Sequence, residues 1–517
     1  MSRRIVIIGA GPGGLAAAML LARAGAGVEV LERHGVVGGR SATIEHEGFR
    51  FDRGPTFFLF GEVLEKIFEA CGRRLADEVD LLRVDPMYRL IFEGGGSLRA
   101  TSDLDRMTDE IARLCPQDAL QLPRLLADNR NKLEAFRPVL EMPFPSALAL
   151  LKPHVIQALR WLRPHHSIDS DLARYFSDHR IRLAFSFQSK YLGMSPYKCP
   201  SLFTILAFLE YEYGVFHPRG GCGAVMEAMA RVARDLGVRI RTNTMVEQIV
   251  FKGRRATGVR TRAGQYDCDA LVINADFAGA VSRLVPDGLR RRWTDAKLAR
   301  KRFSCSTFML YLGIAGRVDL DHHTIFLAED YARNLKEIEE GRVLPRSPSL
   351  YIQHACVTDA GQAPQGCSTL YVLVPVPHHS PHIDWRREAA GYRALVLRRL
   401  AALGLGDIER RIRVEKMMTP VEWRNDLDLY KGATFNLAHS LRQILHLRPR
   451  NRFEDLEGVY LVGGGTHPGS GLPVIFEGAR ITSSLVAQDL GLNQHIETRL
   501  PVVAAPTPGF PQAADIA

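Results

Sequence analysis

The start of the chain is a block of apolar residues interrupted by glycines. Ile5 to Ile8 is a short β-branched run, typical of a buried parallel strand. After a glycine-rich turn, the apolar stretch from Leu15 to Ala24 predicts a helix, and Val28 to Glu32 predicts a second strand. Residues 5 to 22 carry no charge, but their glycine cluster and Pro12 exclude a membrane-spanning helix. The pattern therefore predicts a β–α–β unit.

Further along, helical and β patterns alternate in long blocks. A Leu/Arg-rich stretch from about 96 to 205 predicts helices, and residues 214 to 280 return to α/β character. Between 290 and 445, runs such as Ser368 to Val376 predict a sheet that floors a substrate cavity. The elements expected in the α/β block are a helix at Ala224–Leu236 and strands at Val238–Ile240, Val246–Val250, Gly258–Arg262 and Ala270–Asn274.

These blocks predict a discontinuous chain organisation. One unit is expected to combine residues 1–95, 206–289 and 446–495, and a second unit to combine 96–205 with 290–445. The proline-containing tail, 496–517, is expected to be disordered. With 517 residues, 46% hydrophobic and 24% charged, the chain has the composition of a globular protein with two or more domains.

The turn after the first strand matches the pattern G-x-G-x-x-G through Gly9, Gly11 and Gly14. The first glycine permits a tight turn, the second lets the backbone approach a pyrophosphate, and the third lets the helix pack on the strand. Glu32, 18 residues beyond Gly14, lies where a carboxylate accepts hydrogen bonds from ribose and repels a 2′-phosphate, so NADP is not expected. Arg40, after a glycine pair, is expected to donate to phosphate or ribose oxygens, with an ordinary surface turn as the alternative.

A second glycine-rich turn lies near the other end of the chain. The apolar run that ends at Val462 leads into Gly463-Gly464-Gly465-Thr466-His467-Pro468-Gly469. One dinucleotide site assembled from both ends of the chain points to FAD and a flavoprotein rather than to a nicotinamide dehydrogenase. The expected fold is therefore α/β, with a Rossmann-like FAD-binding domain of the glutathione-reductase or amine-oxidase type.

The cysteines and the net charge indicate which cellular compartment and which partners to expect. The eight cysteines are scattered without a C-x-x-C pair, which predicts reduced thiols, a cytoplasmic protein, no metal site and no disulfide framework. The net charge is +10, and much of it lies between Arg290 and Arg302. This basic cluster is interpreted either as a solvated face or as a site of attraction to anionic lipid. Nucleic-acid binding is not expected, because no aromatic or recognition-helix pattern accompanies the charges.

A second candidate for membrane contact is the stretch from Pro145 to Pro164. Its leucines and Trp161 combine with Lys152 and other basic residues in the pattern of a short interfacial helix, broken near Pro153. A buried helix of the second domain explains the same pattern equally well. Attachment, if it occurs, is expected to be peripheral, at the inner face of the cell membrane.

Several motifs together resemble the carotenoid desaturase family, of the phytoene-desaturase-like kind. They are the flavin-binding start from Arg4 to Thr56, Gly193-Met194-Ser195-Pro196, Gly214 to Gly221, Val272 to Asp276, and the closing segment from Leu461 to Leu490. The resemblance covers most of the chain and implies a discontinuous substrate domain with a helical, membrane-facing lid. The chain departs from the family at Gly471 to Ala479, where the Pro-Gly pair common in phytoene desaturases is replaced. That segment is more similar to relatives acting on shorter or already desaturated carotenoids, including terminal-methyl oxidases.

The motifs and the resemblance together nominate a set of site residues. The candidate cofactor-binding residues are Gly9, Gly11, Gly13, Gly14, Glu32, Arg33, Gly38, Gly39, Arg40, Gly54, Pro55, Thr56, Val246, Asn274, Asp276, Gly464, Thr466, Gly471, Leu472 and Pro473. His467 and Glu477 are the catalytic candidates. For His467, a role in shaping the loop over the flavin is favoured over a chemical one. For Glu477, chemical and helix-capping roles are weighed equally.

The expected reaction is desaturation of a linear, lipophilic isoprenoid of the phytoene or dehydrosqualene class. A flavin accepts a hydride from an allylic carbon while the neighbouring carbon loses a proton, and oxygen or a quinone reoxidises the flavin. The alternatives are a carotenoid terminal-methyl oxidase or isomerase, and another flavin oxidoreductase such as an amine oxidase or a retinoid saturase. A non-enzymatic lipid-binding relative of the Rab GDP-dissociation-inhibitor kind is a third class, which the complete glycine motifs disfavour.

Overall fold

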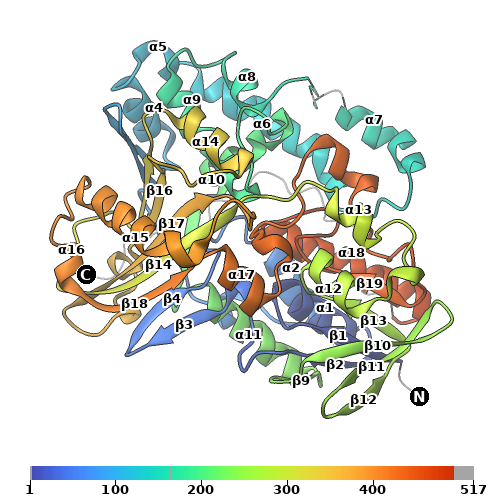
Figure 1. Ribbon diagram of the computed structural model, residues 1–517. Coiled ribbons are helices and arrows are strands. Elements are labelled where there is room, and N and C mark those ends of the chain that lie inside the picture. The colour runs from blue at the N-terminus through green and yellow to red at the C-terminus, as the bar shows by residue number, and fades with distance from the viewer. Residues whose placement is uncertain (1–2, 160, 162, 164, 494–517) are drawn as a thin grey trace.

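A computed structural model of the chain shows two sheets with a helical cap above them (Figure 1). The structure describes residues 3–159, 161, 163 and 165–493. The tail that was predicted to be disordered, 496–517, lies outside the described residues. In the view of Figure 1 the cap helices lie along the upper side, the larger sheet at lower left and the smaller sheet at lower right.

The smaller sheet has five strands in the order β19-β13-β1-β2-β9, paired in parallel wherever the register is defined. The strands are β1 (Arg4–Ile8), β2 (Gly27–Leu31), β9 (Arg239–Arg241), β13 (Ala270–Ile273) and β19 (Val459–Leu461). The central strand β1 is apolar on both faces, since Ile5 and Ile7 pack on one side and Val6 and Ile8 on the other. This explains why the first strand is a continuous apolar run rather than an alternating one.

Helices cover one face of this sheet. They are α1 (Pro12–Arg23), α2 (Glu62–Ala70), α11 (Cys222–Asp235) and α18 (Leu472–Leu490). The other face is covered by α12 (Phe277–Leu284) and by a three-stranded antiparallel sheet of β10 (Val246–Lys252), β11 (Arg255–Thr261) and β12 (Gly264–Asp267). Since α1 and α18 pack against each other, the two ends of the chain meet beside the glycine-rich turn.

The larger sheet has seven strands in the order β18-β14-β17-β16-β15-β6-β7. Its strands are β6 (Tyr88–Phe92), β7 (Ser97–Ala100), β14 (Ser306–Ala315), β15 (His323–Leu327), β16 (Leu350–Gln353), β17 (Cys367–Val376) and β18 (Ile412–Met418). Helix α15 (Trp385–Ala401) packs on one face. Strands β6 and β7, which lie on either side of the boundary expected at residue 95, both pair into this sheet. The division into two units stays a prediction.

Two short antiparallel pairs join the sheets. They are β3 (Thr43–His46) with β4 (Phe49–Asp52), and β5 (Leu81–Val84) with β8 (Val215–Pro218). Phe49 and Phe51 on β4 pack against the larger sheet. These pairs therefore hold the N-terminal segment against the second unit.

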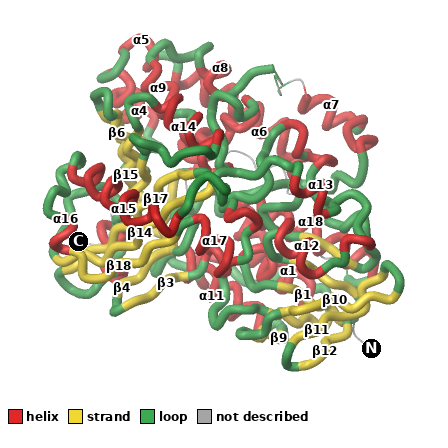
Figure 2. The backbone as a smooth tube through the Cα atoms, viewed as in Figure 1, coloured by secondary structure: helices red, strands yellow, loops and turns green. Residues whose placement is uncertain are grey.

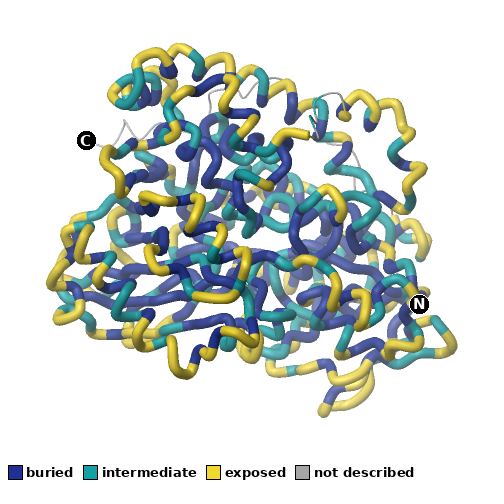
Figure 3. Tube along the Cα trace, turned by 45° about the horizontal axis from the view of Figure 1, so that its top comes forward, coloured by how far each residue is buried: buried dark blue, intermediate teal, exposed yellow. Residues whose placement is uncertain are grey.

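The cap is a layer of helices above the sheets (Figure 2). Its helices are α4 (Leu104–Ala112), α5 (Pro116–Ala119), α6 (Leu122–Leu140), α7 (Pro153–Leu159), α8 (Ile168–Leu172), α9 (His179–Ala184) and α10 (Ile205–Tyr213). Figure 3 shows buried residues running through the middle of the molecule and exposed residues on its outer helices and loops. The block expected to be helical therefore forms the cap, although a membrane-facing role for it remains a prediction.

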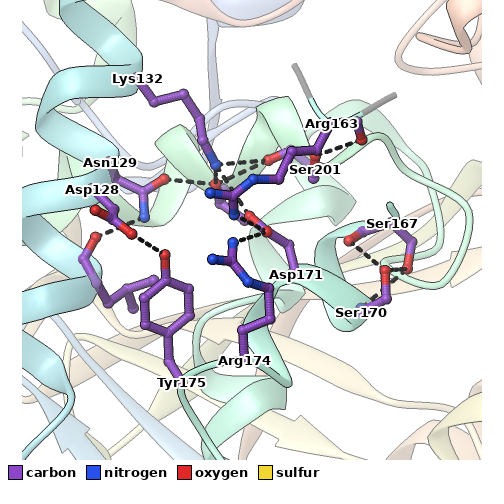
Figure 4. Close-up of polar contacts among 12 residues, drawn as sticks. Asp128, Asn129, Lys132, Arg163, Ser167, Ser170, Asp171, Arg174, Tyr175 and Ser201 are labelled. Carbon is purple, nitrogen blue, oxygen red and sulfur yellow. Dashed lines mark hydrogen bonds and ion pairs between the residues drawn. The ribbon is translucent and has the colours of Figure 1, made fainter. Parts of the chain in front are cut away.

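A buried ionic network fastens α6 to α8 (Figure 4). The Asp171 carboxylate receives Lys132 Nζ at 3.2 Å, Arg163 Nη1 at 2.7 Å and Arg174 Nη1 at 3.1 Å. Lys132 also donates to Thr204 Oγ1 at 2.7 Å. A charge buried to this degree requires close partners, so the network sets how α6 lies over the molecule.

The stretch from 145 to 164 is split, as Pro153 suggested. A 3₁₀ helix over Ala147–Leu151 is followed by α7, and Lys152 between them is extended. Ala149, Val155 and Ala158 are buried, whereas Leu148, Leu151, Ile156 and Leu159 are exposed. The stretch is thus neither fully buried nor fully free: Leu150 and Trp161 also pack against a buried cluster, while the four exposed residues face outward. Residues 160, 162 and 164 lie outside the described residues.

The basic cluster between Arg290 and Arg302 does not form one solvated face. Arg290 is buried and pairs with Asp295 at 2.9 Å, and Arg292 pairs with Glu454 at 3.2 Å. Arg291, Lys297, Arg300 and Arg302 are exposed. Only part of the cluster is therefore available to attract an anionic surface. Among the described helices, none is long and apolar enough to cross a membrane.

Candidate functional site

A cavity of about 540 Å³ lies between the two sheets and the cap. Its wall at the five-stranded sheet includes Gly9 and Glu32, its wall at the larger sheet includes Leu373, and its roof includes Leu133 and Leu209 from the cap. One end is therefore rich in glycine and polar groups and the other is apolar. This arrangement suits a dinucleotide at one end and an apolar molecule at the other.

Most of the predicted cofactor-binding residues border this cavity. They are Gly9, Gly11, Glu32, Arg33, Gly39, Arg40, Gly54, Pro55, Thr56, Val246, Asn274, Asp276, Gly464, Gly471, Leu472 and Pro473. Gly13, Gly14, Gly38 and Thr466 are absent from its wall. The structure thus brings together residues from six separate stretches of the chain.

The glycines of the first turn have different structural roles. Gly9 has a φ of +97°, and a Cβ there would lie 2.4 Å from the Asn274 carbonyl oxygen. A Cβ on Gly14 would lie 2.2 Å from the Gly9 carbonyl oxygen, so this glycine is needed for packing of α1 on the turn. Gly13 packs against Val462 and so supports the site from behind. Among the four glycines of this turn, Gly9 and Gly11 line the cavity, whereas Gly13 and Gly14 do not.

Two long helices begin at the cavity without a capping side chain. Neither α1 nor α18 has a side-chain cap at Gly11 or Gly471, and neither has an acidic residue in its first turn. The amide groups at a helix N-terminus attract anions through hydrogen bonds and the helix dipole. Two such ends at one cavity fit the pyrophosphate of FAD and the negative charge that its ring system gains on reduction.

Glu32 organises the polar end of the cavity. Its carboxylate accepts the backbone amides of Ala10 and His34, both at 2.8 Å, and the residue is buried. Asn274 donates to the Gly9 carbonyl oxygen at 2.9 Å. These bonds tie the ends of β1, β2 and β13 together. The carboxylate therefore already supports the turn, and its remaining lone pairs face the cavity.

Three other predicted ligands also have partners within the protein. Arg33 pairs with Asp428 at 3.0 Å, and half-buried Arg40 donates to the Thr434 carbonyl oxygen at 2.6 Å. Asp276 caps α12 by accepting the Gly279 amide at 3.0 Å. Burial lowers the pKa of Arg40 and raises that of Asp276. These side chains line the cavity and at the same time hold its wall in place.

A buried arginine holds the C-terminal glycine-rich loop. Arg448 donates to the carbonyl oxygens of Gly464 at 2.6 Å and Thr466 at 3.2 Å. Burial lowers the pKa of Arg448 to about 9. Asn451 adds a bond to the His467 carbonyl oxygen at 2.9 Å. The sequence contained no signal for this role, because Arg448 lies outside every motif.

The two catalytic candidates lie in different places. His467 is buried, forms a hydrogen bond from Nε2 to the Met142 carbonyl oxygen at 2.9 Å, and does not line the cavity. Burial lowers the pKa of His467 to about 4, so the ring is neutral. Its position favours the loop-shaping role. Glu477 does line the cavity and pairs with Arg480 at 2.8 Å, six positions into α18 and too far along to cap it.

Polar groups of the cap that belong to no motif also reach the cavity. Glu141 and Arg137 line it beside Glu477, and burial together with the charge of Glu477 raises the pKa of Glu141 to about 7. Tyr191, also in the wall, donates to buried Glu210 at 2.8 Å. Nothing local in the sequence distinguishes these residues from other helix positions, so sequence reasoning missed them.

Comparisons with known proteins agree with this site. A family model described as "Flavin containing amine oxidoreductase" matches residues 12–490. The chain belongs to this family and is an FAD-dependent oxidoreductase. Within it the chain groups with carotenoid desaturases, which confirms the resemblance noted from the motifs.

Two relatives illustrate the match. The 4,4'-diapophytoene desaturase (4,4'-diapolycopene-forming) of Methylomonas sp is 43% identical over 489 residues, which are 94% of this chain and 96% of the relative. The All-trans-zeta-carotene desaturase of Myxococcus xanthus is 38% identical over 517 residues, which are 98% and 96% of the two chains.

A solved oxidoreductase from Methanosarcina mazei has a TM-score of 0.61 at 18% identity, covering 92% of this chain and 98% of its own. Putrescine oxidase bound to putrescine has a TM-score of 0.57 at 17% identity, covering 95% and 99%. At these identities the structures show the fold alone, and that fold is the amine-oxidase type expected from the motifs.

Proposed function

We propose that this protein is an FAD-dependent desaturase that introduces conjugated double bonds into a linear carotenoid precursor of the diapophytoene or phytoene class. One observation carries the proposal: a single cavity joins the glycine-rich end to an apolar chamber under the cap. The names of the relatives support the substrate class. Burying each methylene of such a chain contributes about 0.8 kcal/mol, so apolar walls alone can hold it.

The proposed cofactor position follows from the wall of the cavity. The pyrophosphate would bind over the N-terminus of α1, beside Gly11, and the adenosine ribose would bind to Glu32. The ring system would lie near Thr56 and the N-terminus of α18. Arg40 and Asn274 would hold the walls of the cofactor site in place through their bonds to the Thr434 and Gly9 carbonyl oxygens.

When bound, FAD supplies the hydride acceptor for the reaction. The protein's own contribution is to orient the substrate, exclude water and take up the proton lost by the neighbouring carbon. The apolar cap residues Leu133, Leu206 and Leu209 hold the chain and exclude water. Glu141 can carry a proton close to neutral pH, because its pKa is raised.

We further propose that the protein docks on the inner face of the cell membrane through the segment 147–159. Its Leu148 and Leu151 are 72% and 68% exposed, and Lys152 lies beside them. Exposed apolar side chains next to a basic one suit an anionic lipid surface. The lipophilic substrate and a quinone acceptor would then enter from the lipid, with dissolved oxygen as the alternative acceptor.

Vesicle flotation tests the docking. L148S/L151S should reduce binding to vesicles containing anionic lipid, whereas L120S should not. Leu120 is a matched control because it is 77% exposed and lies beside α5, on a different part of the cap from α7. Equal binding by the two variants would contradict docking through this segment.

The desaturase activity is tested in bacterial cultures that accumulate either phytoene or diapophytoene. Co-expression should give coloured products lighter by two hydrogens per step, and the responding culture identifies the chain length. A second candidate, a carotenoid terminal-methyl oxidase, is favoured by Leu472-Pro473-Val474 in place of the usual Pro-Gly pair. It predicts no change in either culture and oxygen-containing products from a precursor that is already desaturated.

A further inference from the structure

The cavity has polar side chains at the end that lies away from the five-stranded sheet. Lys190 lies on a 3₁₀ helix over Phe187–Leu192, and Tyr331 and Asn334 lie on α14 (Tyr331–Glu340). All three line the cavity. In Figure 1, α14 lies left of centre among the cap helices, whereas α1 and α18 lie at the right. The wall formed by α14 is therefore remote from the glycine-rich turns, and the proposed chemistry gives its polar groups no task.

Lys190 is a cation in an apolar surrounding. Among the described residues, its ammonium has no hydrogen-bond or ion-pair partner. Burial lowers the pKa of Lys190, and Cys305 and Glu339 oppose this change from a distance. The Glu339 carboxylate is already engaged by Lys198 at the surface. Because a buried charge without a partner is costly, the position of Lys190 suits a ligand that brings an opposite charge.

Two arginines elsewhere in the cavity wall show the contrast with Lys190. Arg33 and Arg283 both line the cavity, and both pair with the Asp428 carboxylate, at 3.0 and 3.1 Å. Their charges are therefore compensated within the protein. In the part of the chain that the structure describes, Lys190 has no such carboxylate, so an uncompensated cation is not a general property of this cavity.

The polar atoms of Lys190 and Tyr331 are open to the cavity. Within the described part of the chain, neither Lys190 Nζ nor Tyr331 Oη has a hydrogen-bond partner, and neither atom is fully enclosed by protein. Because both residues line the cavity, the space that these atoms reach is the cavity itself. Asn334 differs, since its Nδ2 is enclosed while its Oδ1 accepts the Ser349 hydroxyl at 3.0 Å. Asn334 thus adds polarity to this wall but no open contact.

Cys305 places Lys190 and Tyr331 in one neighbourhood. Burial raises the pKa of the Cys305 thiol, and the charge of Lys190 opposes this rise. Burial also raises the pKa of Tyr331, and Tyr197 and Cys305 add to that rise. The surroundings are apolar, because Tyr331 and Cys305 pack in one cluster with Ile325, Leu327 and other residues of the cavity wall. This end of the cavity therefore suits an apolar chain that carries a polar end group.

We propose that Lys190 and Tyr331 bind a carboxylate at the end of an apolar chain that occupies the cavity. The inference rests on the proposed function in one respect, namely that an apolar chain enters the space under the cap. Lys190 supplies the opposite charge, and Tyr331 donates a hydrogen bond to an oxygen of the same group. The protein then accepts chains with an oxidised end in addition to hydrocarbon precursors. Both an oxidised isoprenoid and a fatty acid carry such a group, and the experiment separates them.

Ligand binding to the FAD-loaded protein tests this proposal without turnover, so its failure is distinguishable from failure of the desaturase assignment in the bacterial cultures. The probes are geranylgeranoic acid, which is a linear isoprenoid acid, its methyl ester, and stearic acid, which is a straight-chain fatty acid. Equilibrium dialysis below the concentration of micelle formation would give the affinity for each probe. The methyl ester keeps the isoprenoid chain but has no charge, so comparison with the acid isolates the contribution of the carboxylate.

The variants remove one polar group at a time. K190M keeps most of the length of the side chain and removes its charge, and Y331F removes only the phenol oxygen. K198M is the matched control, because Lys198 also lies near Glu339, but its side chain is 61% exposed and is absent from the cavity wall. Flavin content and thermal unfolding would be recorded for each variant. A purely structural role would alter these and would weaken binding of the acid and the ester equally.

The wild-type protein and K198M should bind geranylgeranoic acid roughly tenfold more tightly than its methyl ester, as expected for a hydrogen bond to a charged group. In K190M this preference should disappear while binding of the ester is unchanged, and Y331F should reduce it. No preference in the wild-type protein, or an undiminished one in K190M, would overturn the proposal. Stearic acid that binds as tightly as geranylgeranoic acid would support the site with fatty acids as its ligands, and weaker binding would support it with isoprenoid acids.

A second measurement needs no variant and applies if K190M does not fold. The N-hydroxysuccinimide ester of geranylgeranoic acid reacts with amines that lie beside the bound end group. With the wild-type protein it should acylate Lys190, which peptide mass spectrometry would identify, and an excess of the free acid should prevent this. Acylation confined to lysines outside the cavity would overturn the proposal.

Discussion

Replacing Asp171 with asparagine should loosen the roof of the cavity. The side chains of Asp171 and Lys132 are only 3% and 5% exposed, and they join α8 to α6 (Figure 4). D171N preserves size but leaves the lysine charge without its counterion. Arg163 and Arg174 are 31% and 36% exposed and can turn toward water, whereas Lys132 cannot.

The expected loss of local stability in D171N follows from the burial of this ion pair. Removing one partner of a buried ion pair costs about 3–5 kcal/mol. Lys132 keeps its hydrogen bonds to Thr204 and Ser201, so we expect the lower end, about 3 kcal/mol. At 1.36 kcal/mol per tenfold change, the local opening equilibrium of α6 and α8 should rise roughly hundredfold.

Amide hydrogen exchange followed by mass spectrometry measures this opening. Peptides from α6 and α8 should exchange faster in D171N, while peptides from the five-stranded sheet should not change. The double variant K132M/D171N removes the unpaired lysine charge and should recover most of the lost protection against exchange. Unchanged exchange in D171N, or a double variant as unstable as the single one, would refute the reasoning.

The loss of stability in D171N should also depend on pH and should be largest at low pH. Burial lowers the pKa of Lys132 below its usual value of 10.5, so the native state favours the neutral amine. Loss of the carboxylate lowers this pKa further. The penalty in D171N is therefore largest at low pH and shrinks as the pH rises toward 10.5, where the amine becomes neutral in both states.

The remaining predictions concern the site itself. G14A should weaken FAD retention roughly 5- to 150-fold, measured by flavin release on dilution, because overpacking beside the Gly9 carbonyl oxygen costs about 1–3 kcal/mol. E141Q should flatten the pH dependence of unfolding between pH 4.5 and about 7. In that window the raised pKa makes wild-type stability fall as pH rises, which urea titrations would reveal. H467Q should leave the pH profile of kcat unchanged, and a displaced profile would restore a catalytic role.

The sequence alone determined the elements that rest on local patterns. The β1–α1–β2 unit, the turn at Gly9 and the acid at Glu32 lie within a few residues of their expected bounds, because each is specified by short-range sterics. The strands that start at Val246 and Ala270 were predicted correctly for the same reason, since a short apolar run indicates a strand without any information from distant residues. The place of β6 in the larger sheet was not predicted, because its partner β15 lies more than two hundred positions away.

Only the tertiary structure decided which polar residues meet. Arg448 and Glu210 look ordinary in the sequence, yet their partners lie on other elements of the fold. The sequence favoured a loop-shaping role for His467 but left the chemical and capping roles of Glu477 open. Folding turns His467 toward the cap backbone and Glu477 toward the cavity. Side-chain direction and burial are set by packing between distant segments, and no local pattern encodes them.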